Sequence, residues 1–315
     1  MADTAIVLQK QRDIQSQEEW TRLTREFLAS MDVALSSKAT YERQLRQFLS
    51  WMDETARLEK LASREFEQQD ILAYKQSLLD QGLSVYTINS YLSVVRKLFE
   101  WLEAMKIYPN IARVKGLQKP RGYRKEPLSK EQLREILDSL DRSGLDGLRD
   151  YAMINLMART GLRDVEVSRA MVSDIRQKSG KPVLWVQGKG RDAKDDFVLL
   201  TPEAEKPVRA YLKARGKLQE NAPVFCSHSD RNKGQALTTR SISRIVKESF
   251  RDVGLDSKQL TAHSLRHTAI TLSILGGASL HQAQAMARHS SSDTTLIYFH
   301  NLDRVEAGAE QFIAF

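Results

Sequence analysis

The sequence predicts a mainly α-helical protein with a small antiparallel β-sheet, divided into two domains. Three observations lead to this prediction. Apolar residues recur at helical spacing through the first third of the chain, a basic segment rich in proline and glycine follows, and helical patterns then resume around one short stretch of strand-like periodicity. The chain has 315 residues, 41% of them hydrophobic, so each half can bury a core.

Four amphipathic helices are predicted in the first third, and together they would form a small bundle. The first covers residues 17–30, the third covers 67–79, and the fourth starts at Ser84. The second follows Ser36 and Ser37, a pair that can cap it. Its apolar face consists of Tyr41, Leu45, Phe48, Leu49 and Met52.

The polar faces of two of these helices are candidate contacts to nucleic-acid phosphates. The side chains concerned are Lys38, Thr40 and Arg43 on the second helix and Ser84 and Thr87 on the fourth. Most solvated helix faces have a similar composition, so an ordinary surface is the alternative interpretation.

A basic segment separates the two helical parts. Residues 106–125 contain seven lysines and arginines and no acidic residue, and prolines and glycines interrupt regular structure there. We therefore expect a linker over residues 107–126, between a first domain over 17–106 and a second over 127–315. A strap along DNA is favoured over a plain tether, because no fold requires so many charges there. Its candidate phosphate contacts are Lys119, Arg121 and Arg124.

The second domain is predicted to combine helices with one β-hairpin. Ser129 and Gln132 have the spacing of a capping box, and a later helix over residues 148–158 ends near Gly161. Residues 182–186 and 197–200 resemble paired strands around a Gly-Lys-Gly turn at 188–190. Thr201 and Pro202 then open a series of helices that continues to the C-terminus.

Composition narrows the class of protein. The formal net charge of +8 suits a polyanionic partner, although a merely basic protein fits it equally well. Cys226 is the only cysteine, which excludes an internal disulfide and a site with several thiolates. No secretory signal is recognisable, and the longest uncharged apolar stretch, 269–280, is short of the ~20 residues of a membrane helix. We expect a cytoplasmic protein without membrane contact.

The residues that could take part in catalysis lie in four short segments: 160–166, 188–190, 263–267, and 289–291 with Tyr298 after it. Each is ambiguous alone. An arginine at a helix start usually pairs with an acid, a Gly-Lys-Gly turn is usually a plain hairpin, and an isolated tyrosine is most often a core residue. His263 and Arg266 share a helix face, but such a pair is commonly structural.

In order, however, these residues resemble the tyrosine recombinases, the family of phage integrases and Xer-type recombinases. The matching series is Arg163, Lys189, His263, Arg266, His289 and Tyr298, and the resemblance covers the chain from about residue 17. It implies a SAM-like core-binding bundle and a mixed α/β catalytic domain. It also implies a site-specific recombinase that cleaves and rejoins DNA through a 3′-phosphotyrosyl intermediate and a Holliday junction.

The residue types fit that chemistry. Arg163 and Arg266 can hold the non-bridging oxygens of a phosphodiester through forked hydrogen bonds. Tyr298 has a reference pKa near ~10 and must lose its proton as it attacks, and His263 is the candidate base. His289 would donate a hydrogen bond to a phosphate oxygen. No metal or other cofactor is required.

The remaining site residues have supporting or alternative roles. Lys189 is the candidate general acid for the leaving 5′ hydroxyl, with Arg191 and Lys194 as alternatives. Glu166 is expected to orient Arg163 or a histidine, and His267 is interpreted as structural.

The chain departs from the family pattern at two places. Asp192, Asp195 and Asp196 lie among the basic residues after the hairpin lysine. Arg288 stands where the family usually has glycine, so we expect ordinary backbone angles there and a guanidinium that can reach a phosphate. Arg240 and Arg244, on the helix after Thr238, are further candidates for DNA contact.

The expected partner is double-stranded DNA carrying a specific attachment or resolution site. The resemblance implies a homotetramer on DNA, with or without a second recombinase or accessory proteins. A tail helix bearing Leu302, Val305, Ala309, Phe312 and Ile313 would dock on a neighbouring subunit or on its own domain.

Three functional alternatives remain at this point. The recombination could serve integration and excision of a mobile element, or it could serve resolution of DNA multimers. A type IB topoisomerase uses a similar pocket to relax DNA. A non-enzymatic DNA-binding protein could retain the same scaffold.

Overall fold

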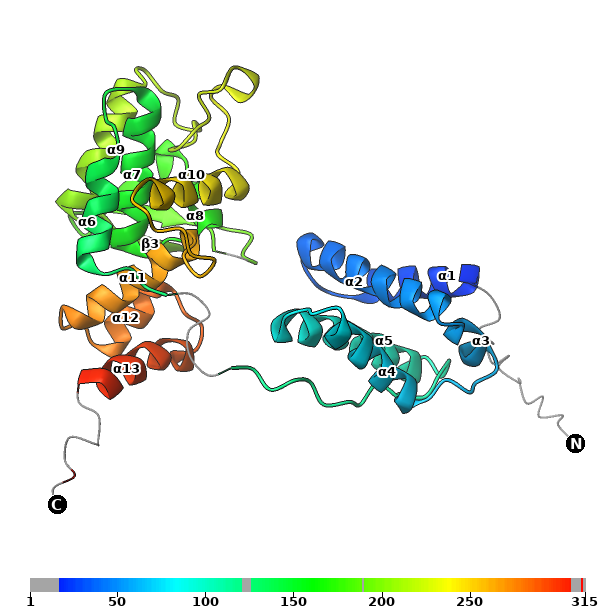
Figure 1. Cartoon of the computed structure of the whole chain (residues 1–315). Coiled ribbons are helices and arrows are strands. Elements are labelled where there is room, and N and C mark those ends of the chain that lie inside the picture. The colour runs from blue at the N-terminus through cyan, green and yellow to red at the C-terminus, as the bar shows by residue number, and fades with distance from the viewer. Residues whose placement is uncertain (1–16, 121–125, 189, 307–312, 314–315) are drawn as a thin grey trace, which may run out of the picture. The chain divides into compact units, whose positions relative to one another are not determined.

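A computed structural model of the chain describes residues 17–120, 126–188, 190–306 and 313 (Figure 1). These residues divide into two compact units, one up to residue 121 and one from residue 122. Five residues of the sequence-based predictions lie outside the described ranges: Arg121, Arg124, Lys189, Ala309 and Phe312.

The described part of the first unit is a bundle of helices. Their bounds are α1 Gln17–Ser30, α2 Leu35–Glu54, α3 Arg57–Ala62, α4 Gln68–Asp80 and α5 Val85–Ala104. The short α3 was not predicted, because six residues are too few to show a helical period. Ser84 caps α5 by accepting from the Thr87 amide at 3.2 Å. The cap predicted for α2 is wrong, since α2 starts at Leu35 and contains Ser36 and Ser37 in its first turn.

The bundle core extends into the predicted linker. Aromatic rings fill its centre, with Phe48 edge-on to Tyr74 at a centroid distance of 4.8 Å. Ile107, Tyr108 and Val114 are buried in the same cluster, although they follow the last helix. Residues 107–117 therefore pack on the bundle, because their apolar side chains alternate with the basic ones.

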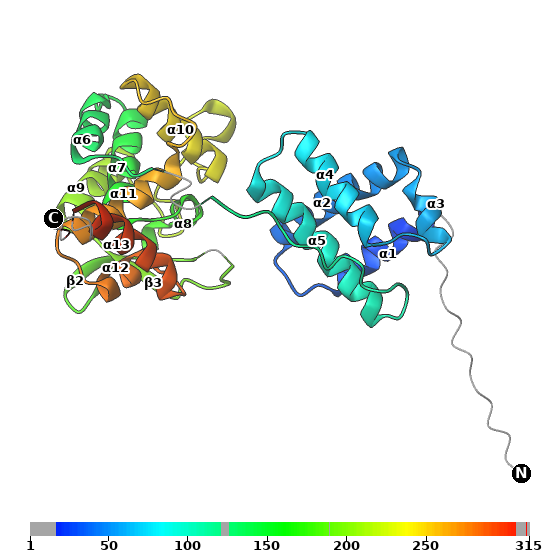
Figure 2. The same ribbon diagram turned by 60° about the horizontal axis from the view of Figure 1, so that its bottom comes forward.

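The second unit consists mainly of helices around one sheet (Figure 2). The α-helices are α6 Lys130–Ser139, α7 Leu145–Thr160, α8 Asp164–Arg169, α9 Pro202–Ala214, α10 Thr239–Asp252, α11 Ala262–Leu275, α12 Leu280–Ala287 and α13 Ser292–Glu306. Short 3-10 turns cover Val172–Asp174 and Asp230–Asn232. The predicted capping box is present at α6, where the Ser129 hydroxyl accepts from the Gln132 amide at 3.1 Å.

The sheet contains three antiparallel strands in the order β1-β2-β3. Their bounds are β1 Ile175–Lys178, β2 Lys181–Val186 and β3 Asp196–Leu199. Leu184 of β2 pairs with Ile175 on one side and with Val198 on the other. The hairpin of β2 and β3 was predicted, whereas β1 was not recognised, because its four residues are mostly polar.

The core of the second unit surrounds α7, which is buried over most of its length and packs against α9 and α11. A smaller cluster of Ile270, Ala287 and Tyr298 joins α11, α12 and α13. In the described residues, no helix is long and apolar enough to cross a membrane. The prediction of a mainly helical fold with a small antiparallel sheet is confirmed.

Candidate active site

The C-terminal end of α12 is surrounded by three arginines. Its last carbonyls, those of Met286 and Ala287, accept from Arg288 at 2.6 Å and from Arg266. The next carbonyl, that of Arg288, accepts from Arg163 at 3.5 Å. A helix C-terminus has partial negative charge and unpaired carbonyls, so it can hold guanidiniums in place.

A second helix end holds two of these arginines. Gly161 ends α7 in the left-handed conformation, with a φ of 63°. Its carbonyl accepts from Arg266 at 2.6 Å and from Arg288 at 3.3 Å. Arg163 follows two residues later, so the turn after α7 brings the three guanidiniums together.

Glu166 provides the carboxylate of the cluster. Its fully buried side chain accepts from the Arg163 amide at 2.8 Å and from the Arg163 guanidinium at 2.9 Å. Arg288 donates to both carboxylate oxygens, to Oε2 at 2.7 Å and to Oε1 at 3.4 Å. Burial raises the pKa of Glu166, but the ion pairs with Arg288 and Arg163 outweigh burial and the net pKa is lowered. The carboxylate is therefore ionised at neutral pH.

The expectation of ordinary backbone angles at Arg288 is wrong. Its backbone is left-handed, with φ 53° and ψ 48°, which is the conformation that glycine adopts most readily. Its side chain is only 5% exposed and points to Glu166. The guanidinium binds the buried carboxylate of Glu166, and Arg288 also lines the cavity described below.

The cluster has more positive than negative charge, since Arg163, Arg266 and Arg288 surround the single carboxylate of Glu166. Burial, followed by repulsion from Arg163 and Arg288, lowers the pKa of Arg266 to about 9. The Arg266 guanidinium is nevertheless protonated at neutral pH. A partly buried excess of guanidinium donors favours a bound anion such as a phosphate group.

Tyr298 and two histidines lie beside this cluster. The Tyr298 hydroxyl is 2.6 Å from Nδ1 of His267. The His289 ring lies 6.3 Å from the Tyr298 ring, centroid to centroid, and its Nδ1 is 2.9 Å from the Thr295 hydroxyl. Tyr298 itself is 4% exposed. The structure thus brings Arg163, Arg266, His289 and Tyr298 together from four parts of the sequence.

His267 is a contact of Tyr298 that the sequence interpretation missed. Its ring also meets His263 edge-on, at a centroid distance of 4.8 Å. Burial, followed by the charges of His263 and Arg266, lowers the pKa of His267 to about 4. His267 is therefore neutral near pH 7. Its position directly after Arg266 and four residues after His263 was the available signal.

His289 has a similar electrostatic environment. Burial, followed by the guanidiniums of Arg266, Arg163 and Arg288, lowers its pKa to about 4. A neutral imidazole can donate one hydrogen bond to a phosphate oxygen and still accept another.

A cavity of about 490 Å³ opens between this cluster and the β2–β3 hairpin. Arg163, Arg288 and His289 line one side, and Gly188 and Arg191 line the other. The predicted general acid at position 189 lies outside the described residues, next to Gly188. Of its alternatives, Lys194 is tied to Asp174 at 2.5 Å, whereas Arg191 lines the cavity.

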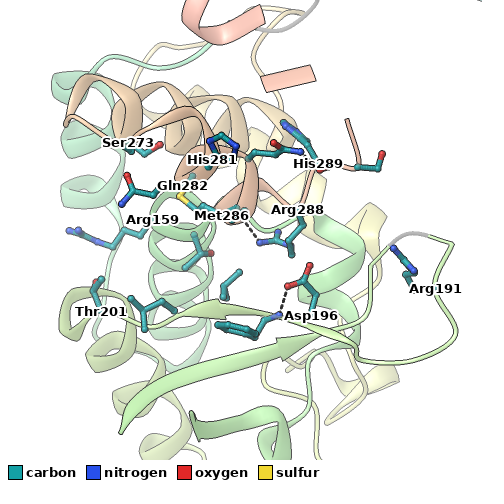
Figure 3. Close-up of a pocket in the computed structure, with 18 residues that line it drawn as sticks. Arg159, Arg191, Asp196, Thr201, Ser273, His281, Gln282, Met286, Arg288 and His289 are labelled. Atoms are coloured by element: carbon teal, nitrogen blue, oxygen red, sulfur yellow. Dashed lines mark hydrogen bonds between the residues drawn. The ribbon is translucent and has the colours of Figure 1, made fainter. Parts of the chain in front are cut away.

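A larger cavity of about 840 Å³ lies on the other side of Arg288, between α12 and β3. Figure 3 shows Arg288 on the α12 side of this cavity and Asp196 on the hairpin side, with Arg191 farther along the same loop. Asp196 lines both cavities. Asp195 and Asp196 of the hairpin therefore line the same cavity as Arg163 and Arg288.

The predicted DNA contacts lie on helix surfaces and on the basic strap, which is the predicted linker over residues 107–126. Arg43, Ser84, Lys119, Arg240 and Arg244 are exposed, and Lys38, Thr40 and Thr87 are half-buried. Arg244 already pairs with Glu248 at 3.0 Å. Their contact with DNA is still a prediction. Across the described residues, no group of histidine, cysteine, aspartate and glutamate side chains is placed to hold a metal ion.

Comparison with known proteins gives matches over most of the chain. The profile of the phage integrase family matches residues 126–304, and that of the phage integrase N-terminal SAM-like domain matches residues 21–106. A tyrosine recombinase of Synechococcus elongatus is 29% identical over 303 residues, covering 93% of both chains. The tyrosine recombinase XerD of Listeria innocua is 30% identical over 270 residues, covering 82% of this chain and 86% of XerD.

A solved structure has the same fold. The XerH site-specific recombinase, in a post-cleavage complex with its palindromic difH substrate, superimposes with a TM-score of 0.72. The two sequences are 20% identical, and the superposition covers 95% of this chain and 85% of XerH.

Proposed function

The chain belongs to the phage integrase family and is a site-specific tyrosine recombinase, and from this premise we propose that Tyr298 is its nucleophile. One observation carries the proposal. Tyr298 packs against Ala287, the last residue of α12, and the Ala287 carbonyl accepts a hydrogen bond from Arg266. The tyrosine and the arginine cluster therefore both lie at the C-terminal end of α12.

In the proposed reaction, Arg163 and Arg266 bind the non-bridging oxygens of the scissile phosphate, and His289 donates a further hydrogen bond. Negative charge on these oxygens increases in the transition state, so preorganised donors stabilise it more than the ground state. Glu166 does not touch the phosphate. It orients Arg163 through the two contacts described above.

The bonds change as follows. The Tyr298 oxygen forms a bond to phosphorus while the bond from phosphorus to the 5′ oxygen breaks. The product is a 3′-phosphotyrosine and a free 5′ hydroxyl. The Tyr298 proton goes to a histidine, for which the sequence suggested His263 and the 2.6 Å contact favours His267. Lys189 donates the proton that the leaving oxygen needs. A 5′ hydroxyl from another strand reverses the step and rejoins the DNA.

The proposed substrate is double-stranded DNA with a specific site, and the similar fold of XerH in its DNA complex supports this. Strand exchange between two duplexes through a Holliday junction requires several subunits, so we propose a homotetramer. Because the substrate is cellular DNA, the reaction belongs in the cytoplasm. Integration or excision of a mobile element and resolution of multimers are both consistent with this chemistry.

The C-terminal segment is the proposed contact between subunits. Deleting residues 305–315 is expected to weaken cooperative synapsis of two sites more than binding to one site. Gel-shift titrations with one-site and two-site DNA distinguish these effects, and an equal loss of both would argue for packing on the same subunit.

A suicide substrate tests the nucleophile. Nicked DNA with the candidate site is mixed with the wild type, with Tyr298→Phe and with Tyr151→Phe as a matched control, and adducts are resolved under denaturing conditions. We expect an adduct with the wild type and the control and none with Tyr298→Phe. No adduct from a wild type that binds the site would instead indicate a non-enzymatic DNA-binding protein.

A further inference from the structure

Arg288 adopts a backbone conformation that is costly for its residue type. A left-handed φ of 53° costs a residue with a side chain about 1 kcal/mol or more relative to glycine. Its side chain is also buried, which removes a charged group from water. The contacts of the guanidinium must offset the cost of the left-handed backbone and the cost of burying the charge. These contacts therefore indicate the role of Arg288.

Those contacts join three segments of the site. The Arg288 guanidinium donates to Met286 at the end of α12, to Gly161 at the end of α7 and to Glu166 in α8. The Arg288 carbonyl in turn accepts from the Arg163 guanidinium. Arg163 is therefore held on one side by Glu166, which Arg288 binds, and on the other by the backbone of Arg288 itself.

Arg288 also determines the charge balance of the cluster. Its ion pair with Glu166 is the largest of the contacts that lower the pKa of that carboxyl. Because Arg288 binds both carboxylate oxygens and the Arg163 guanidinium binds one of them, Glu166 is shared between two cations. The positive charge of Arg163 is therefore only partly neutralised by Glu166 and can attract a phosphate. Without Arg288, Glu166 would have Arg163 as its only close partner and would neutralise it.

We propose that Arg288 is a positioning residue for the phosphate pocket: it holds Glu166 in place and fixes Arg163 and the turn into His289 for the incoming phosphate. Its guanidinium is occupied by Met286, Gly161 and Glu166, so we do not assign it as a phosphate ligand. This inference rests on the proposed function, because it assigns to Arg288 the arrangement of groups that bind the scissile phosphate.

The test uses Arg288→Gly and Arg288→Lys in the full chain. Glycine removes the guanidinium and adopts the left-handed backbone without strain. Lysine retains the positive charge but lacks the paired N–H donors of the guanidinium. Ser179→Gly is the matched control, because Ser179 is an exposed residue with a φ of 50° outside the site. Each protein is measured for equilibrium DNA binding, for the single-turnover rate of adduct formation on the nicked substrate, and for the pH dependence of that rate.

We expect Arg288→Gly to slow adduct formation about 10–100-fold, as loss of an orienting partner commonly does. Binding to DNA should change less than about threefold, since the Arg288 guanidinium is already bound by Met286, Gly161 and Glu166. Arg288→Lys should recover part of the rate, and Ser179→Gly should react like the wild type.

The pH profile separates positioning from a merely structural role. In Arg288→Gly, burial still raises the pKa of Glu166 but the main opposing ion pair is absent, so this pKa rises. The acid limb of the rate should then move to higher pH, and it should not move when Glu166→Gln is already present. A structural role alone would lower the rate equally at all pH values.

The outcomes are distinct. If the wild type forms no adduct, the proposed function fails. If the wild type reacts and Arg288→Gly reacts as fast with the same acid limb, only the role of Arg288 is overturned. If thermal unfolding shows that Arg288→Gly does not fold, Arg288→Lys decides: a slower rate with a raised acid limb supports the role, and a wild-type profile overturns it.

Discussion

The hydroxyl of Tyr298 lies 2.6 Å from Nδ1 of His267, which places an uncharged imidazole beside the proposed nucleophile. Burial and the neighbouring charges lower the pKa of His267 to about 4, so the imidazole is unprotonated throughout the neutral range. The His267 ring also meets the ring of His263 at a centroid distance of 4.8 Å, and His263 is exposed near the start of α11. We therefore propose His267 as the first acceptor of the Tyr298 proton.

Replacing His267 should slow cleavage. His267→Phe keeps a ring but removes the acceptor, and we expect the single-turnover rate of adduct formation to fall about 100-fold, in the range of lost general-base catalysis. His267→Gln, which retains an acceptor, should lose less. His281→Phe, on the exposed side of α12, is the control and should react normally. A wild-type rate for His267→Phe together with a slow His263→Phe would return the role of base to His263.

The two depressed histidine pKa values predict how stability depends on pH. A histidine with a folded pKa of about 4, against 6.5 when unfolded, binds fewer protons in the folded state. Its contribution to stability is therefore complete above pH 6.5 and is lost as the pH falls from 6.5 to 4. For His267 the loss is at most about 3 kcal/mol.

Urea unfolding of the full chain between pH 4.5 and 7.5 checks this expectation. His267→Gln should flatten the slope, because the group whose pKa differs between the two states is gone. NMR titration of the His289 ring should give a low pKa in the free protein. Added phosphate should raise it by offsetting the nearby guanidiniums. An His289 pKa near 6.5 without phosphate would contradict the buried, cationic environment.

Arg163 and Arg266 should differ in their effect on stability. Arg266 is 2% exposed and satisfies the buried carbonyls of Gly161 and Ala287, so Arg266→Ala should cost about 2–4 kcal/mol. The side chain of Arg163 is 26% exposed, and Glu166 retains Arg288 when it is removed. Arg163→Ala should therefore cost about 1 kcal/mol or less.

Both substitutions should abolish adduct formation, since both guanidiniums are proposed to bind the phosphate. Hydrogen exchange of the amides of α7 and α11 in the full chain measures the stability difference within the second unit. Equal protection in the two variants would show that Arg266 contributes little to the fold.

Local sequence patterns were sufficient for most of the fold. The cap at Ser84, the capping box at Ser129 and the β2–β3 hairpin each depend on a few adjacent residues, and the structure has all three. The elements that escaped prediction, α3 and β1, are short and depend on tertiary packing. For the site, the order and types of Arg163, Arg266, His289 and Tyr298 resembled the tyrosine recombinases and so implied the chemistry, and the fold brings these residues together.

The sequence could not indicate two features that arise from burial. Arg288 is a left-handed C-cap of α12, and its guanidinium reaches a buried carboxylate 122 residues earlier in the chain. His267 contacts Tyr298 because α11 and α13 pack together. The Arg288–Glu166 and His267–Tyr298 contacts each join segments that are far apart in the sequence. Local sequence patterns do not show which distant segments pack together.

The basic strap offers the last prediction, because its first part is attached to the bundle. The Asn89 side chain in α5 accepts from the Leu117 amide at 2.7 Å and donates to the Leu117 carbonyl at 2.9 Å. A Cβ atom at Gly116 would lie 2.6 Å from the same side-chain oxygen. Asn89→Ala and Gly116→Ala should both release the strap, and two lost hydrogen bonds correspond to about 1–2 kcal/mol.

Trypsin cleavage after Lys115 measures that release, because proteolysis follows the population of the open state. We expect cleavage to accelerate about 5–30-fold in both variants, given that 1.4 kcal/mol is a factor of ten. Gln76→Ala removes an exposed contact to Asp80 in α4 and serves as the control. Unchanged cleavage in both variants would mean that the apolar side chains of Ile107, Tyr108 and Val114 alone hold the strap on the bundle.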